Sequence, residues 1–337
     1  MRKLLKFARI APRLAYALIA GAIVRSMRRL LRRPPRIWHG FGALFFTAAH
    51  AAADRRAGFP VRSVALHTRL ASYALVRSEE FDAVYDTSGE GHWLCLADLL
   101  LHGDIWYTHF ESLFFRHDQR RMNHFAFRLI RLAGIRIIVS PHGGDILHRH
   151  RYVSRYDWIG RAQRDYPEWD LDAFARDANA RIEFFCRYAD LVLGGDSALV
   201  RMLPRRDLFF PSLVMDTEAF APAPPIDRAV PKVVHAPNHR YTKGTDFLLA
   251  AVDRLKARGI ACELVLVERV ARAEALALYA DADIVADQFI IGGWGVLASE
   301  GMMLGKPVMT YLDEEHLGDP VFNMPVVNTT PENLERV

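Results

Sequence analysis

The chain has 337 residues, of which 51% are apolar, and a formal net charge of +5. This length and apolar share exclude a disordered chain and suffice for two α/β domains, each with its own core. Cys95, Cys186 and Cys262 lie far apart in apolar segments, which predicts buried thiols in a reducing, cytoplasmic setting and neither disulfides nor a metal site.

The positive charge is concentrated at the N-terminus. Residues 1–36 carry eleven Lys or Arg and no acid, which leaves 33 basic against 39 acidic side chains in the rest. Because the excess charge is confined to this segment and no nucleic-acid-reading module accompanies it, nucleic-acid binding is not predicted.

Residues 1–35 are predicted to form a basic amphipathic helix. The uncharged run from Leu14 to Val24 is shorter than the roughly 20 residues that a spanning helix needs. Arginines on both sides of an apolar run are typical of a helix in the headgroup layer of an anionic membrane, which predicts a peripheral location at the inner face of the plasma membrane. The alternatives are a helix that packs on the protein with its basic face in water, or a misassigned start of the chain.

Residues 36–220 alternate between strand and helix patterns. Residues 36–68 are expected to form a strand, a helix that ends at Gly58 and a second strand from Val61. Further strands are expected at 81–87, 105–110 and 135–140, with helices between them, and this order predicts a parallel, doubly wound sheet. Residues 149–168 show little periodicity and are interpreted as an irregular excursion at the ligand cleft. A longer helix is expected over 171–187.

Residues 221–231 contain four prolines and are predicted to be the linker between two domains. The same alternation then resumes over 232–337, with strands expected at 232–237, 262–268, 283–289 and 307–312, and it indicates a second, nucleotide-binding Rossmann-like domain. Residues 331–337 have the pattern of a capped helix start without a stop signal, an indication that this second domain is truncated.

The most informative segment is Ile290 to Leu312, where a glycine-rich turn leads into an apolar helix. The N–H groups at the start of a helix can bind an anion at close range when small residues precede them, here Gly292, Gly293 and Gly295. Glu300 is expected on the second turn of this helix, where its carboxylate can accept hydrogen bonds from a ribose diol. Its neighbours are apolar nearly all round, so Glu300 is predicted to be buried and to need a partner.

A second segment, Tyr241 to Leu249, precedes the first by about fifty residues. Lys243 lies just before Gly244 and Thr245, which open another helix. The ammonium group and the helix-start amides together suit a diphosphate.

As a pair, these segments resemble the donor-binding domain of retaining glycosyltransferases of the family 4 type (glycosyl transferases group 1). The resemblance extends from about residue 135 to the C-terminus, is strongest after Val233, and includes segments 141–145, 187–200, 214–222 and 235–245. It implies the GT-B fold, in which two Rossmann-like domains face each other across a cleft. It also implies transfer of a sugar from a nucleotide-diphosphate sugar, with retention of configuration, to a glycan or lipid-linked acceptor in cell-surface polysaccharide or glycolipid synthesis.

The resemblance assigns roles to individual residues. It implies that Glu300 binds the ribose, that Lys243 neutralises the diphosphate, and that His142 faces the transferred sugar. It also implies that backbone groups of the glycine turn and helix start contact the donor, here Gly293, Gly295 and Val296. The family usually carries an arginine five residues before the lysine, where this chain has Asn238, and whether Arg240 takes over that role is left open.

Other polar residues near the predicted site have alternative interpretations. The family often has a glutamate eight residues before the ribose glutamate, but Gly292 occupies that position, so backbone amides, Asp287 or Gln288 are expected to contact the sugar. Asp145 is expected either to bind the acceptor or to cap the next turn.

No cofactor is predicted besides the nucleotide-sugar substrate, and no metal site. His109 and Glu111 lack a third ligand at a useful spacing.

Two other functions remain open. A catalytically silent GT-B subunit that binds a partner glycosyltransferase would fit the missing first glutamate. A nucleotide-sugar 2-epimerase would share the fold and the ribose glutamate, but it would have little use for a basic amphipathic helix.

Overall fold

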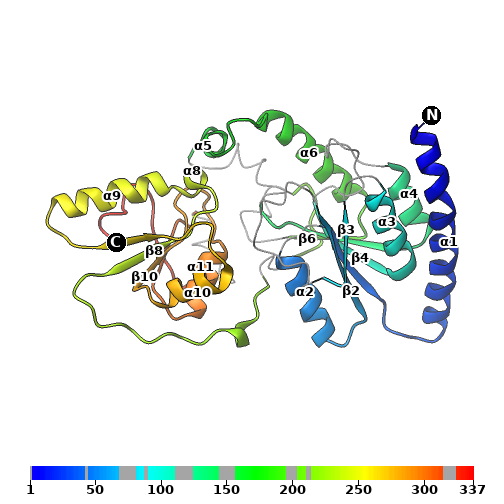
Figure 1. The fold of residues 1–337 in the computed structure, drawn as a ribbon, viewed down its shortest axis with the longest axis horizontal. Helices are drawn as coiled ribbons and strands as arrows, with labels where there is room; N and C mark the ends of the chain where they lie inside the picture. The colour runs from blue at the N-terminus through cyan, green and yellow to red at the C-terminus, as the bar shows by residue number, and fades with distance from the viewer. Residues whose placement is uncertain are drawn as a thin grey trace. The chain divides into compact units, whose positions relative to one another are not determined.

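The computed structural model describes residues 2–41, 45–67, 81–86, 90–110, 124–143, 156–194, 203–209, 214–313 and 324–337 (Figure 1). They form two compact units. Unit 1 comprises the described residues of Met1–Ile146, Phe174–Gly195 and Leu203–Val214, and unit 2 those of Leu147–Ala173 and Met215–Val337. Each unit contains one sheet, and every strand pair is parallel, as the alternating sequence pattern predicted.

Unit 1 has a seven-stranded sheet in the order β3-β2-β1-β4-β5-β6-β7. The strands are β1 (Ile37–Phe41), β2 (Val61–His67), β3 (Ala83–Asp86), β4 (Ile105–His109), β5 (Arg136–Ser140), β6 (Leu191–Gly194) and β7 (Leu208–Phe209). The helices are α1 (Arg2–Leu30), α2 (Phe45–Arg56), α3 (Gly91–His102), α4 (His124–Leu132) and α6 (Leu171–Tyr188), the last of which begins in unit 2. Large apolar side chains from the central strands and from α3 are fully buried, among them Trp38, Trp106, Ile137, Leu96 and Leu99.

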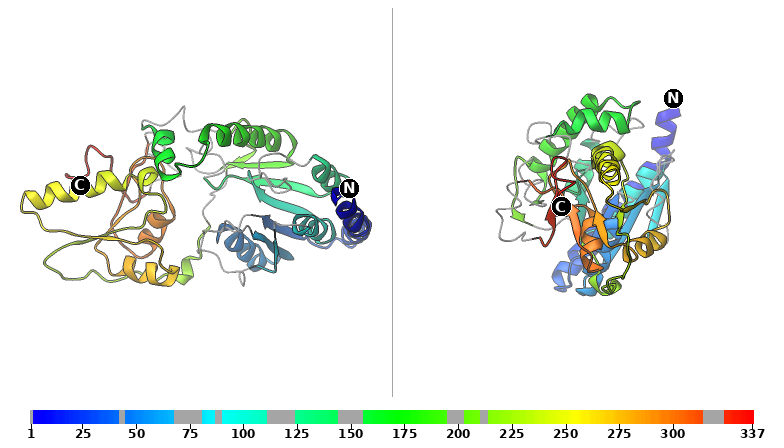
Figure 2. Two further views of the ribbon diagram at one scale, coloured as in Figure 1. Left: turned by 45° about the horizontal axis from the view of Figure 1, so that its top comes forward. Right: turned by 90° about the vertical axis from the view of Figure 1, so that its left-hand side faces the viewer.

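The N-terminal helix α1 packs along α3 (Figure 2). The buried side of α1 repeats every three or four residues, with Ile10, Leu14, Ala17 and Arg25 all 4% exposed or less. At Gly21 an added Cβ would lie 2.0 Å from the carbonyl oxygen of Leu100, so only glycine permits this close helix approach.

The buried Arg25 anchors α1 to unit 1. Its guanidinium donates to the carbonyl oxygens of Ala133 (2.9 Å), Leu100 (2.8 Å) and Gly103 (3.0 Å). Burial lowers the pKa of Arg25 to about 10. The segment was expected either to contact a membrane or to pack on the protein. In the structure, one face of α1 packs on the protein.

Unit 2 has a five-stranded sheet in the order β12-β11-β10-β8-β9. The strands are β8 (Lys232–His235), β9 (Glu263–Leu266), β10 (Ile284–Ala286), β11 (Val308–Thr310) and β12 (Val327–Asn328). The helices are α5 (Trp158–Asp165), α8 (Arg240–Lys243), α9 (Thr245–Ala257), α10 (Arg272–Ala280) and α11 (Val296–Met303), with a 3-10 turn, η3, at Thr217–Ala219.

Both faces of the unit 2 sheet are covered (Figure 1). Val233 on β8 packs among side chains of α9, whereas the next residue, Val234, packs among those of α10 and α11. Successive strand residues point to opposite faces, so this alternation gives the sheet one core on each side. The arrangement is that of a doubly wound Rossmann-like domain.

Two local predictions need correction. Residues 149–168 were expected to be irregular, but α5 forms within them, begun by Asp157, whose carboxylate accepts from the Gly160 N–H at 2.9 Å. Residues 331–336 form turns where a helix start was expected. Although α5 and residues 166–173 fall within the predicted range 36–220, their contacts group them with unit 2.

Candidate functional site

The candidate donor site of unit 2 is built on two neighbouring strands. β8 and β10 pair with each other, with Val234 opposite Val285 and His235 opposite Ala286. At their carboxyl ends, β8 leads into α8 and α9, and β10 leads through the glycine turn into α11. Ligands of open α/β sheets bind at this end of the strands.

Lys243 and Asp287 meet at the start of α11. The Lys243 Nζ lies 3.7 Å from the Asp287 Oδ1, and Oδ2 of the same carboxylate accepts from the Gly295 N–H at 2.6 Å. A Cβ at Gly295 would lie 2.9 Å from Oδ1 and 3.1 Å from Nζ, so a side chain there would displace the pair. This packing places an ammonium group beside the N-terminus of an eight-residue helix, where the first N–H groups have no partner within the helix.

Gln288 holds the glycine turn. Its Oε1 accepts from the N–H groups of Ile290 (3.2 Å) and Ile291 (2.7 Å), and its Nε2 donates to the carbonyl oxygens of Gly293 and Tyr311. The side chain is 1% exposed. The amide predicted as a possible sugar contact is thus engaged by the turn itself.

The backbone at Gly292, eight residues before Glu300, accounts for the absence of a glutamate at this position. Its φ is +85°, and a Cβ there would lie 3.3 Å from both the Cβ of Asp313 and the Cε1 of Tyr311. A non-glycine residue is strained at such a φ. With this backbone, position 292 therefore cannot carry a glutamate without a change of the turn.

Glu300 is buried, as predicted, and its partner is Arg272 at the first position of α10. The side chain of Glu300 is 6% exposed, and its Oε1 accepts from the Arg272 Nη2 at 2.6 Å. Burial raises the pKa of Glu300, an effect that Arg272 opposes and nearby Asp287 reinforces. No local pattern in the sequence indicates Arg272 as the partner, because 28 positions separate the two residues.

His235 joins three elements beneath the site. The Ala286 carbonyl oxygen can only accept, so at 2.8 Å it takes a proton from Nδ1 of His235, and Nε2 then accepts from the Thr245 hydroxyl at 2.8 Å. Burial lowers the pKa of His235 to about 4. A neutral imidazole thus ties β8 to β10 and to the first residue of α9.

Helix α5 holds the segment that carries Lys243. Asp165, the last residue of α5, accepts from the N–H groups of Tyr241 (3.0 Å) and Thr242 (2.7 Å) and from the Thr242 hydroxyl (2.7 Å). The guanidinium of Arg164 lies 3.7 Å from the centre of the Tyr241 ring. These contacts come from the segment that was expected to be irregular, and they fix the start of α8.

Arg240 does not approach the other site residues. Its guanidinium makes a two-point ion pair with Glu268, with distances of 2.8 Å and 2.6 Å. Arg240 is half exposed, and Lys243 is the basic residue of this loop that contacts the buried carboxylate.

His142 belongs to unit 1 and lies two residues after β5. Its ring meets that of His109, at the end of β4, edge to face with 5.1 Å between centroids. The His109 Nδ1 is 2.9 Å from the carbonyl oxygen of Ser140. Asp145 and Glu111 lie outside the described residues.

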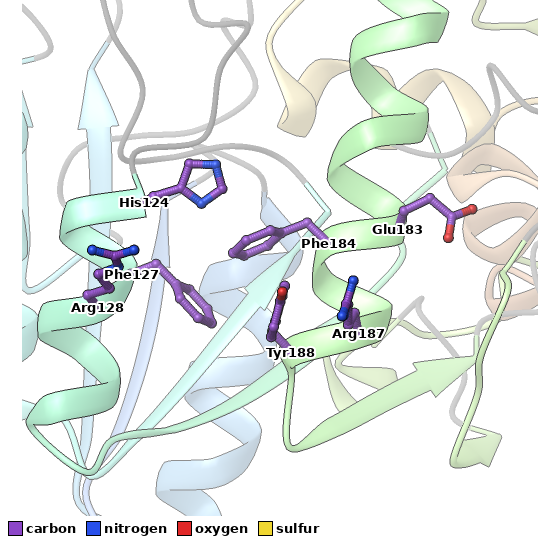
Figure 3. Close-up of a pocket in the computed structure, with 7 residues that line it drawn as sticks. All are labelled: His124, Phe127, Arg128, Glu183, Phe184, Arg187 and Tyr188. Carbon is purple, nitrogen blue, oxygen red and sulfur yellow. The ribbon is translucent and has the colours of Figure 1, made fainter.

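A hollow of about 560 Å³ lies elsewhere in unit 1, between α4 and α6 (Figure 3). It is lined by aromatic and charged side chains from these helices, namely His124, Phe127, Arg128, Glu183, Phe184, Arg187 and Tyr188. None of the residues singled out from the sequence contributes to it. Within the described part of the chain, no group of three or more His, Cys, Asp or Glu side chains is arranged to hold a metal ion.

The fold defines the class of protein: the chain has the GT-B fold. No protein-family model matches the sequence, and no curated protein matches it significantly. The similar solved structures include sucrose-phosphate synthase from Thermosynechococcus elongatus, with 13% identity, a TM-score of 0.54, and coverage of 90% of this chain and 87% of the other.

A second similar structure is the catalytic domain of starch synthase IV from Arabidopsis thaliana, determined with ADP and acarbose. It shares 12% identity with a TM-score of 0.50, and 85% of each chain is covered. At these identities the likeness concerns the fold.

Proposed function

We propose that the protein is a retaining glycosyltransferase of the family 4 type, which binds a nucleotide-diphosphate sugar in unit 2 and transfers the sugar to a glycan or lipid-linked acceptor bound by unit 1. The observation that carries the proposal is the meeting of Lys243, the start of α11 and buried Glu300 at the carboxyl ends of β8 and β10. One of the similar structures agrees with a nucleotide ligand, because it was determined with ADP.

In this proposal each group has a distinct task. Lys243 and the α11 amides bind the diphosphate and stabilise the negative charge that develops on it as the bond to the sugar breaks. Glu300 binds the ribose hydroxyls. A carboxylate has about four acceptor positions, so Glu300 can accept from Arg272 and from the ribose together.

His142 and the rings beside it are proposed to face the transferred sugar and the acceptor. The leaving diphosphate accepts the acceptor proton, so the mechanism needs no carboxylate base in unit 1. Cell-surface polysaccharide or glycolipid synthesis is the proposed setting.

Calorimetry on the purified protein tests the donor site. The protein is titrated with UDP, GDP, ADP and their common sugar conjugates, alongside Lys243→Ala and Glu300→Ala. Each variant removes a charge-assisted contact, so we expect the affinity for one nucleotide family to fall by about 10- to 100-fold. Matched controls are Lys256→Ala and Glu274→Ala, both exposed on helices of the same unit, which should bind like the unsubstituted protein.

A silent GT-B subunit is the second candidate, favoured by the backbone at Gly292, which excludes the first glutamate of the family. If the folded protein binds none of these nucleotides, the transferase proposal is wrong and the silent subunit takes its place. Conversion of a bound sugar nucleotide to its 2-epimer without an acceptor would instead identify an epimerase.

A further inference from the structure

Helix α1 has a second apolar face, opposite the face that packs on α3. Five large side chains on it are exposed by 55% to 84%, namely Tyr16, Ile19, Ile23, Met27 and Leu30. At 100° per residue they form one stripe on the side opposite Leu14, about 21 Å long at 1.5 Å per residue. We call these five residues the outer stripe.

The outer stripe has basic side chains at both ends. Arg9 and Arg13 precede it, and Arg32 and Arg33 lie beyond its end, all of them exposed. No acid occurs in residues 1–36. A contiguous apolar stripe with positive charge at both ends suits a partner that has an apolar interior and a negatively charged surface.

We propose that the outer stripe docks on an anionic lipid bilayer, with α1 parallel to the membrane plane and still packed on α3. The five apolar side chains enter the boundary between headgroups and acyl chains, and the flanking arginines bind lipid phosphates. This inference is independent of the proposed glycosyl transfer, because it rests only on α1.

The contacts of α1 with unit 1 argue against a spanning helix. Arg9–Leu30 is long and apolar enough to cross a membrane by length and composition alone. A span, however, would break the three hydrogen bonds of Arg25 and the close approach at Gly21, and it would bury that guanidinium in lipid.

Charge argues against a second copy of the chain as the occupant. In a twofold pair the same patch meets itself, so the arginines at the two ends of one stripe would face those of the other. Like charges brought together in this way oppose association.

Vesicle flotation tests the proposal with the full chain. Sealed vesicles of phosphatidylcholine are compared with vesicles containing 30% phosphatidylglycerol (about one lipid in three, enough for a negative surface potential). We expect flotation with the anionic vesicles only and its reversal by high salt. Ile19→Glu/Ile23→Glu should lower the partition coefficient by more than about tenfold.

The matched control is Ile226→Glu/Ile260→Glu, which changes two exposed isoleucines of unit 2 in the same way and should float like the unsubstituted protein. Circular dichroism melts confirm that both variants fold. The proposal would be overturned if the α1 variant floated like the unsubstituted protein, or if the unsubstituted protein did not float. Membrane retention that resists alkaline carbonate would overturn it in favour of a spanning helix. A dimer lost in Ile19→Glu/Ile23→Glu without vesicle binding would overturn it in favour of a second copy.

Discussion

The two units carry different chemistry at the carboxyl ends of their strands. In unit 2 these positions hold paired charged groups, namely the buried carboxylates of Asp287 and Glu300 and the partly buried Lys243. In unit 1 the corresponding edge holds the rings of His109, at the end of β4, and His142, after β5, while Tyr107 in the middle of β4 contacts His39 and His50.

This difference separates two kinds of ligand. A lysine beside a helix start can neutralise a diphosphate, whereas an imidazole ring such as that of His142 offers a face and single hydrogen bonds that suit a neutral sugar. The proposed function would thus place the charged part of the donor in unit 2 and neutral hydroxyl groups in unit 1. Substitutions in each unit can break or sharpen this contrast.

Gly295→Val should remove nucleotide binding. The valine side chain would intrude between Asp287 and Lys243. Neither the ammonium group nor the helix start could then bind the diphosphate. Two charge-assisted contacts amount to about 4 kcal/mol, a loss of roughly 1,000-fold in calorimetry. Ala257→Val, at the exposed last residue of α9, is the control, and retained affinity in Gly295→Val would refute the assignment of the anion site.

Unit 2 should lose stability in acid through His235. Its pKa is about 4 in the folded protein and about 6.5 when unfolded, so the unfolded state binds the additional proton between these values. Stability is therefore complete above about pH 6.5 and falls as the pH drops to about 4, by about 3 kcal/mol in total.

Hydrogen exchange of β8 and β10 peptides at pH 7 and pH 5, corrected for intrinsic rates, measures this change. In His235→Gln the pH dependence should be much smaller. An equal pH dependence in the variant would show that another group is responsible.

Asp165→Ala should weaken nucleotide binding without abolishing it. The substitution removes three hydrogen bonds from the start of α8, and the looser segment should cost about 1 kcal/mol, or about fivefold in affinity. Asp253→Ala on the exposed side of α9 is the control. Equal affinities of the two variants would mean that α5 does not position Lys243.

His142→Ala should leave the affinity for the nucleoside diphosphate within about twofold, because no charge is removed from the site in unit 2. The turnover of the intact nucleotide sugar should fall instead. Calorimetry with the diphosphate and an assay of sugar transfer separate the two effects. A larger loss of diphosphate affinity would contradict the division of chemistry between the units.

Much of the fold was predictable because it follows from local patterns. The alternation of apolar strands with helices predicted β8, α9, β10 and α11, and their parallel pairing. Helix α5 was missed because eight residues are too few for a clear period within an otherwise irregular segment, and it forms where Asp157 caps its start and Asp165 contacts α8.

The residues of the candidate site were predictable where they depend on local sequence, but their distant partners were not. Glycines and a lysine at strand ends indicated an anion site from residue types alone, and the apolar neighbours of Glu300 indicated its burial. The partner of that carboxylate and the task of His235 required the folded chain, because each joins residues that only the packing of strands and helices brings together.

By itself, the sequence determined the alternation of elements, the positions of the glycine turn and the linker, and the basic character of the N-terminal helix, since all of these depend on neighbouring residues. Only the tertiary structure decided that Arg272 pairs with Glu300, that α5 holds the Lys243 segment, and which face of α1 is buried. These outcomes depend on side chains far apart in the chain that compete for the same buried space and the same hydrogen bonds, and packing resolves that competition.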